Sequence, residues 1–147
     1  KFGMEYTDKD GTKKNPYIIH RTSIGCYERT LAYLIEKYAG AFPVWLSPTQ
    51  VKVITVSENN DNYAKEVERK LQLAGVRVEC DLDNESVGKK IRNAVLDKTP
   101  YILVLGDKEM ADGTVAVRAR GSKDTEVMPY ADFENLLLEK INSKSLQ

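Results

Sequence analysis

Between residues 51 and 105 the sequence alternates short runs of apolar, β-branched residues with amphipathic stretches. Strands are expected over 51–56, 76–80 and 101–105, with helices that begin near residues 61 and 86. Strands joined through such helices are parallel, and the helices cover both faces of the sheet. The run Tyr101–Leu105 is apolar throughout, as in a central strand that is buried on both faces. The pattern therefore predicts an α/β fold.

The remaining C-terminal residues extend this expected sheet. Asp112 and Gly113 indicate a turn, and residues 114–120 then alternate between apolar and polar side chains, which places Arg118 on the polar face. A last helix is expected over 130–142. We therefore expect one domain over 48–147, with a mixed sheet made of βαβαβ, a hairpin strand and a C-terminal helix.

Residues 1–47 have a different pattern. The expected elements are a β-hairpin, made of a strand over 2–6, a turn over 8–11 and an extended run over 16–20, and then a helix over 27–38. Gly40 ends that helix, and Pro43 prevents its restart. The irregular segment 42–50 is the expected junction, so the domain boundary is predicted after residue 47.

The bulk properties narrow the possible functions. Lys plus Arg equals Asp plus Glu, 22 each, so any contact with RNA must come from a local patch. No apolar run approaches the ~20 residues that span a bilayer, so a membrane is not an expected partner. Two cysteines without a CxxC spacing suit a reducing cytoplasm. The sequence shows no P-loop, no GxSxG motif and no paired metal motif.

Two residues of the first segment are candidates for chemistry, and each has an ordinary structural alternative. A lone histidine such as His20 is more often structural than a ligand. Arg29, in the first turn of the expected helix, can stack on an aromatic base or pair with a neighbouring acid at the surface. The residues alone leave both alternatives open.

The string Gly25-Cys26-Tyr27-Glu28-Arg29 resembles motif 3 of class II aminoacyl-tRNA synthetases, and residues 19–48 resemble threonyl-tRNA synthetases in particular. The resemblance implies that residues 1–47 are the C-terminal remnant of a class II catalytic domain. The resemblance implies that Arg29 is a catalytic residue that stacks on the adenine of ATP, with Gly25 also in the ATP site. It implies that His20 is one of three zinc ligands in the intact enzyme. That zinc would bind the amino and hydroxyl groups of threonine, which allows rejection of valine. The implied cofactors of the intact enzyme are zinc and magnesium.

Segments 76–78, 81–85, 88–92 and 100–109 resemble the anticodon-binding domain of the same enzymes. The resemblance implies that Asn84, Glu109 and Arg118 contact anticodon bases. Asn84 and Glu109 each follow the carboxyl end of an expected strand, where open α/β sheets bind ligands. A carboxylate accepts from guanine N–H groups, and Arg and Asn can donate to base carbonyls. Which residue reads which base stays open.

Further charged residues lie next to these. Lys89, Lys90 and Arg92 either contact phosphates or form a solvated face of the helix whose inward residues are expected at 87, 91, 94 and 95. The resemblance also implies exposed apolar surface around Ile18, Ile24 and Leu31, which missing parts of the enzyme would cover.

The resemblance implies that the chain is part of a threonine–tRNA ligase and recognises the anticodon of threonine tRNA. ATP and threonine are partners of the intact enzyme, an expected homodimer. The fragment is an expected monomer without a bound cofactor, and it is inactive because class II motifs 1 and 2 are missing. Two alternatives remain: an accessory RNA-binding protein on the same domain, and a domain that mainly mediates dimerisation.

Overall fold

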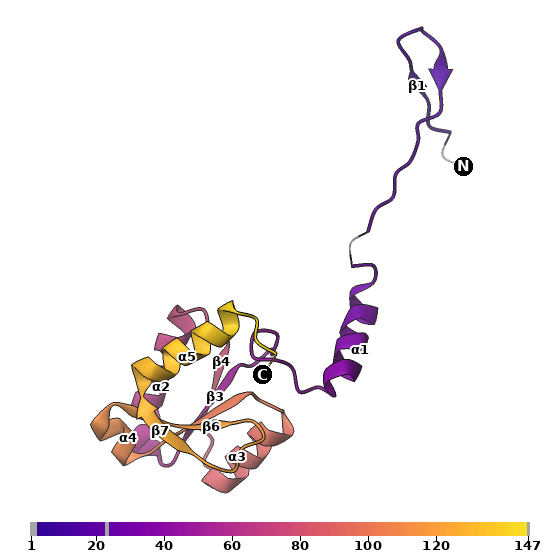
Figure 1. Cartoon of the computed structure of the whole chain (residues 1–147). Coiled ribbons are helices and arrows are strands. Elements are labelled where there is room, and N and C mark those ends of the chain that lie inside the picture. Colours follow the sequence, from indigo (N-terminus) through magenta and orange to yellow (C-terminus); the bar gives the residue numbers. More distant parts are fainter. Residues whose placement is uncertain (1–2, 23, 147) are drawn as a thin grey trace. The chain divides into compact units, whose positions relative to one another are not determined.

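The larger of the two units into which the chain divides, Leu34–Gln147, is built on a five-stranded mixed sheet. The computed structural model describes residues 3–22 and 24–146. The strands are β3 (Val51–Thr55), β4 (Val78–Asp81), β5 (Tyr101–Leu105), β6 (Thr114–Ala119) and β7 (Glu126–Pro129), in the order β4-β3-β5-β6-β7 (Figure 1). Strand β3 pairs in parallel with β4 and β5, whereas β6 pairs antiparallel with β5 and β7. The predicted α/β fold with a mixed sheet is confirmed.

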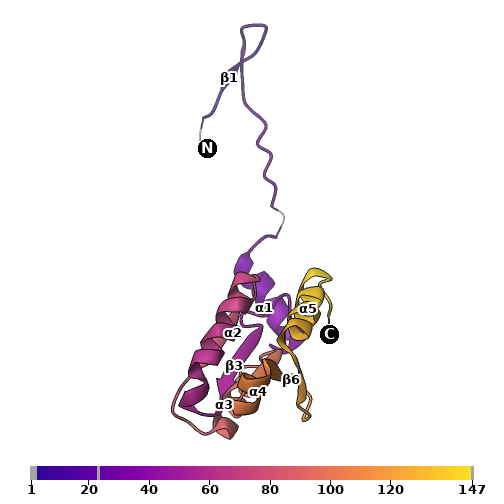
Figure 2. The same ribbon diagram turned by 90° about the vertical axis from the view of Figure 1, so that its left-hand side faces the viewer.

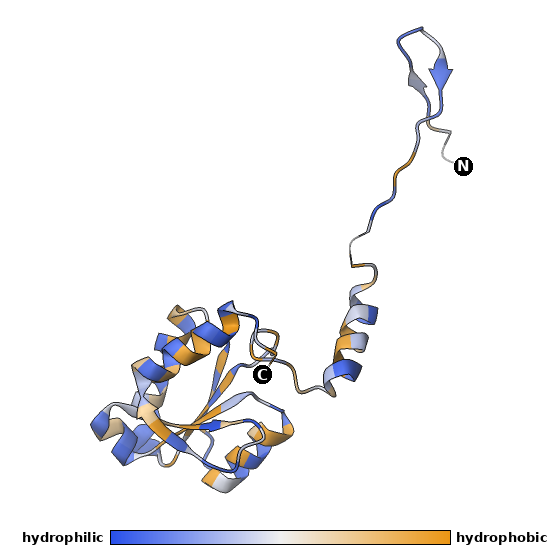
Figure 3. Cartoon of the chain, viewed as in Figure 1, coloured by the Kyte–Doolittle hydropathy of each residue, from blue (hydrophilic) through white to orange (hydrophobic). Residues whose placement is uncertain are grey.

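Helices cover both faces of this sheet, as the sequence predicts. Helices α2 (Asp61–Leu73) and α5 (Tyr130–Asn142) pack on one face, and α3 (Val87–Leu96) packs on the other (Figures 1 and 2). Neighbouring β5 residues face opposite layers: Leu103 joins the α2–α5 core, and Ile102 joins the α3 core. This alternation explains why β5 is apolar along its length. In Figure 3 the central strands are accordingly coloured as largely hydrophobic.

The expected strand boundaries shift by one or two residues. Strand β3 ends at Thr55 instead of residue 56, and β4 begins at Val78 instead of residue 76. Val76 does not join the sheet because its N–H donates to the carbonyl of Leu71 at 3.0 Å, which closes the turn after α2. Gly75 permits that turn, since its φ is +83°.

Two elements near the C-terminus are missing from the sequence prediction. The predicted turn at 112–113 is confirmed at Gly113, a left-handed residue that leads into β6, but it also ends a helix that was not predicted, α4 (Asp107–Asp112). Six residues are too few to show helical periodicity. Edge strand β7 was also not predicted, since most of its residues are exposed and form no apolar run.

The smaller unit, Lys1–Tyr33, contains a two-stranded hairpin, β1 (Tyr6–Thr7) with β2 (Lys13–Lys14). The predicted strand over 2–6 is therefore displaced, and residue 2 lies outside the described residues. The second strand ends at Lys14, so the run 16–20 is not part of a strand.

The helix predicted over 27–38 is confirmed as α1 (Tyr27–Tyr38), which crosses the boundary between the units. Ile18, Ile24 and Leu31 are 72%, 54% and 56% exposed, as expected from the sequence. No helix in the described part of the chain is long and apolar enough to cross a membrane.

The segment before β3 is fixed to the sheet by two polar side chains. The Arg77 guanidinium donates to the carbonyls of Trp45 and Ser47, both at 2.9 Å. The buried Gln50 amide donates to Val44 O at 2.9 Å and accepts from the Arg77 N–H at 2.9 Å. Val44 is itself 3% exposed and belongs to the main core. The domain boundary after residue 47 stays a prediction.

Candidate nucleic-acid interface

Two of the three expected anticodon contacts follow the carboxyl ends of the parallel strands. Asn84 lies exposed in the loop after β4, and Glu109 lies half-buried in α4, which begins two residues after β5. The intervening strand β3 pairs with both β4 and β5 in parallel register. Both side chains therefore belong to the same edge of the sheet, as the sequence predicts.

The Glu109 carboxylate also organises the backbone around it. Its Oε2 accepts a hydrogen bond from the Gly106 N–H at 2.9 Å, three residues earlier, and so caps the start of α4. A methyl group at Gly106 would lie 3.1 Å from that Oε2 and 3.4 Å from a methyl group of Val56. The close approach of this backbone to the carboxylate explains glycine at the position.

Arg118 lies apart from that edge, on a face of the sheet. Its direct partner across the β5–β6 ladder is Ile102, the second residue of β5. The distance from Ile102 to the end of β5 is three residues, or about 10 Å. The Arg118 side chain is half-buried, and its Nε donates to the carbonyl of Ser122 at 3.1 Å. This contact holds the guanidinium along the strand.

The sheet face around Arg118 is partly open to solvent. Direct cross-strand partners share a face, so Arg118 lies on the same side as Ile102, the side that α3 covers further along the sheet. Ala116 shares this face with its β7 partner Val127, which is 60% exposed. A flat ligand with several hydrogen-bonding edges could therefore extend from the carboxyl edge onto this face. Splayed bases of an RNA loop have this form.

The lysines of α3 divide between surface and interior. Lys89 is exposed and pairs with Glu85, and that hydrogen bond raises the pKa of Lys89. Arg92 is exposed as well, so a phosphate contact by either residue stays a prediction. Lys90 is only 3% exposed, and both of its expected roles are wrong. Val95, expected inward, is 53% exposed.

The spacing of residues along α3 could have revealed that Lys90 is buried. Lys90 lies three residues after Val87 and four before Ala94, both of which pack in the α3 layer, so it shares their face. A lysine at such a position is easily taken for a surface residue, because lysine is rarely buried.

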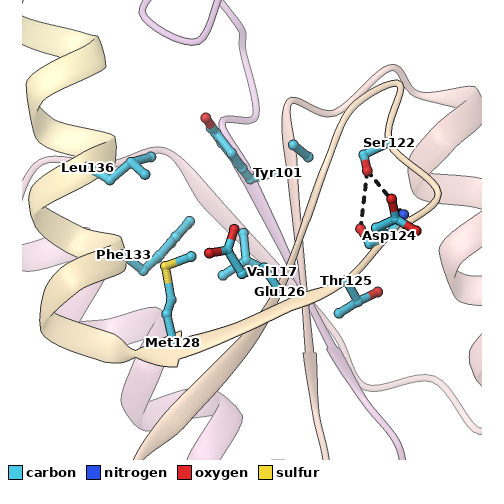
Figure 4. A pocket seen from close by; sticks show the side chains of 10 residues that line it. Tyr101, Val117, Ser122, Asp124, Thr125, Glu126, Met128, Phe133 and Leu136 are labelled. Carbon is cyan, nitrogen blue, oxygen red and sulfur yellow. Dashed lines mark hydrogen bonds between the residues drawn. The ribbon is translucent and has the colours of Figure 1, made fainter.

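A cavity of about 330 Å³ lies elsewhere, between α5 and strands β5 to β7 (Figure 4). Tyr101, Phe133 and Leu136 form part of its apolar side, and Asp124 and Glu126 lie at its polar side. The cavity is lined by none of the three expected anticodon contacts. We therefore place the candidate site at the carboxyl edge and the open face, where the donors and acceptors for bases lie.

The residues expected to serve ATP and zinc lie in the first unit. Gly25 adopts a φ of +78°, and its N–H donates to the Thr22 hydroxyl at 3.1 Å. Arg29, in the first turn of α1, and His20 are both exposed. Within residues 3–22 and 24–146 no three His, Cys, Asp or Glu side chains group as metal ligands. A tight zinc site needs three or four ligands, so His20 alone does not supply one.

Comparison with known proteins finds related sequences over almost the whole chain. Residues 50–140 match the family described as "Anticodon binding domain". Over 144 residues the chain is 55% identical to threonine–tRNA ligase from Clostridium perfringens (strain SM101 / Type A), and this match covers 98% of the chain and 22% of that protein. It is 51% identical to threonine–tRNA ligase from Carboxydothermus hydrogenoformans, covering 98% of the chain and 23% of that protein.

A solved structure has a similar fold. The crystal structure of the RNA binding domain of threonyl-tRNA synthetase from Cryptosporidium parvum Iowa II matches with a TM-score of 0.71 and 36% identity. The match covers 82% of this chain and 29% of that one. The chain thus spans less than a third of the length of each of these relatives.

Proposed function

The chain belongs to the family of anticodon-binding domains, and on that premise we propose that it recognises the anticodon loop of threonine tRNA. The two relatives named threonine–tRNA ligase are 55% and 51% identical to it over 144 aligned residues, which is 98% of its length. The proposal extends to the parent protein, a ligase that activates threonine with ATP and transfers it to the tRNA. An accessory RNA-binding role is not favoured, because these relatives are named as ligases.

The observation that carries the proposal is the placement of Asn84 and Glu109 at one sheet edge, with Arg118 on the adjoining open face. The carboxylate can accept from the N–H groups of a guanine, and the amide and guanidinium can donate to base carbonyls. Threonine anticodons share G and U at their second and third positions. Three separated side chains suit bases that an RNA loop splays apart.

The test is a set of variants titrated with a threonine-type anticodon stem-loop at fixed salt. Asn84→Ala and Arg118→Ala should each weaken binding about tenfold, the scale of one lost hydrogen bond to a buried base. Glu109→Gln keeps an oxygen that can cap α4 but removes the charge, so it separates base recognition from folding. Asp112→Ala, exposed on the same helix, is the matched control. Variants that bind as tightly as the control would refute these contacts.

We further propose that the chain is catalytically inactive by itself, because class II motifs 1 and 2 are absent from its sequence. Arg29 and Gly25 would belong to the ATP site of the intact enzyme, and His20 to its zinc site. The intact enzyme would be a cytoplasmic homodimer that uses zinc and magnesium, whereas the chain alone would be a monomer. Threonine-dependent exchange of pyrophosphate into ATP by this chain would disprove the claim of inactivity.

A further inference from the structure

Lys90 is a buried cation close to the candidate site. Its Nζ lies 3.2 Å from the Asp81 carbonyl and 3.4 Å from the Thr55 hydroxyl, and the nearest carboxylate oxygen, Oδ1 of Asp81, is 4.0 Å away. The Lys90 side chain is 3% exposed and that of Asp81 is 12% exposed. Asp81 ends β4 and Thr55 ends β3. The ammonium therefore joins the carboxyl ends of two neighbouring strands.

This placement is unfavourable for folding alone. Removing an ammonium from water costs several kcal/mol, which a single carboxylate at 4.0 Å offsets only in part. Lys90 also lies in the first turn of α3, where the helix dipole disfavours a positive charge. An apolar residue would fill the same position among Val87, Ile91 and Ala94 more simply. The charge at this position therefore points to a role beyond packing.

The contacts of Lys90 lead directly to the loop that carries Asn84. The Asp81 Oδ1 that faces Lys90 also accepts the N–H of Asp83 at 3.2 Å, next to Asn84 in the chain. Lys90 and Asn84 line the same small cavity of about 40 Å³. On the other side, Thr55 leads into Val56, whose N–H donates to Leu105 O at 3.0 Å, just before the backbone that Glu109 caps.

We propose that Lys90 is a positioning residue. It holds the 82–86 loop, and with it Asn84, in a fixed position relative to helix α4, which carries Glu109. Its ammonium fixes Asp81 and Thr55, and Asp81 fixes the loop backbone at Asp83. Lys90 itself does not touch the RNA. This role rests on the proposed recognition of an anticodon loop, and it has a consequence for the free chain: without Lys90 the loop loses its fixed position.

The first measurement uses the chain without RNA. Amide hydrogen exchange is compared between the wild type, Lys90→Met and the control Lys65→Met, an exposed lysine on α2. Lys90→Met should speed exchange in residues 82–86 about tenfold or more, and leave strands β5 and β6 unchanged. Unchanged exchange in the 82–86 loop overturns the proposal, whether or not the chain binds RNA.

The second measurement asks whether Lys90 acts through Asn84. Wild type, Lys90→Met, Asn84→Ala and the double variant are titrated with the threonine-type stem-loop at several salt concentrations. Lys90→Met should weaken binding about tenfold, and Asn84→Ala should then cost little more in that background. Additive losses overturn the proposal. A salt slope lowered by about one in Lys90→Met also overturns it, since that would mean a direct phosphate contact.

Two further variants cover the case in which Lys90→Met does not fold. Thr55→Val removes the hydroxyl that Lys90 contacts, and Thr55→Ser retains it. Faster exchange of the 82–86 loop in Thr55→Val, with wild-type exchange in Thr55→Ser, supports the proposal, and equal exchange in both overturns it. A wild-type chain that does not bind the stem-loop would refute the proposed function, while the exchange measurement would still decide whether Lys90 positions the loop.

Discussion

The two cysteines of the chain show how local environment sets the chemistry of a side chain. Burial raises the pKa of the Cys80 thiol to about 11, and the nearby carboxylates of Glu68 and Asp61 act in the same direction. Cys26 is exposed at the start of α1, and its Sγ donates to the Glu28 carboxylate at 2.8 Å. Thiolates are the reactive species, so the two residues should differ in reactivity.

We predict that iodoacetamide at pH 8 alkylates Cys26 before Cys80. A thiol with a pKa of about 11 is ionised to only about one part in a thousand at that pH, and Cys80 is also half-buried. Mass spectrometry of tryptic peptides over time gives both rates. Denatured chain should label both cysteines at similar rates, and similar rates in the folded chain would contradict the burial of Cys80.

Glu79 gives a pH-dependent prediction. Hydrogen bonds from Lys52 at 2.9 Å and Thr49 at 2.8 Å lower its pKa below the usual 4.5. A carboxyl whose folded-state pKa is depressed stabilises the fold above the unfolded pKa and loses that contribution as the pH falls through the folded pKa. Because the side chain is 57% exposed, the contribution is below about 1 kcal/mol.

Glu79→Gln should therefore lower the free energy of unfolding by less than about 1 kcal/mol at pH 7, and by a smaller amount at pH 3, where the carboxylate begins to be protonated. Urea unfolding of the wild type and the variant at both pH values measures this loss of stability. An equal loss at pH 3 and pH 7 would show that the ion pair is not the cause.

At the scale of elements, the sequence was informative wherever apolar residues formed a continuous run or a helical period. The apolar run of β5 and the helical periods of α1 and α5 match the structure residue for residue. Helix α4 and strand β7 were not predicted, because one has only six residues and the other is an exposed edge. Helix α4 is fixed by the local Glu109 cap, whereas β7 depends on its pairing with β6.

One prediction at the scale of helices and strands concerns the packing of α5 on the sheet. Phe133 is fully buried, and its ring lies edge-on to Tyr101 with centroids 5.7 Å apart. Phe133→Ala should destabilise the domain by about 3–5 kcal/mol, because the lost contacts leave a cavity. Asn135→Ala, exposed on the same helix, is the control and should change stability by less than about 0.5 kcal/mol. Urea unfolding that gives similar midpoints for both variants would contradict this packing.

At the scale of the whole molecule, the sequence and the family resemblance predicted most of the candidate site. Strand order placed Asn84 and Glu109 at carboxyl ends, since parallel strands bring those ends together. The separation of Arg118 from that edge could not be predicted, because it depends on the register of β6 against β5. Helical spacing could have placed Lys90 on the inner face with Val87 and Ala94, but no local pattern reveals its partners, the Thr55 hydroxyl and the Asp81 carbonyl, which lie on two different strands.

The segment before β3 yields a prediction about the limits of the domain. A chain over 42–147 keeps Val44 and the carbonyls that bind Arg77, whereas a chain over 48–147 loses all of them. We expect the shorter chain to be less stable by about 2 kcal/mol or more, the scale of one buried valine and two charged hydrogen bonds. Equal urea midpoints for the two chains would place the boundary after residue 47.

The central claim is that this chain distinguishes anticodon loops by sequence. The most direct measurement titrates the wild-type chain with a threonine-type anticodon stem-loop and with the same loop after exchange of its central G and U, at two stated salt concentrations. We predict tighter binding of the first loop by about tenfold or more, with a ratio that salt changes little, since bases and not phosphates are read. Equal binding of both loops at each salt concentration would contradict the claim.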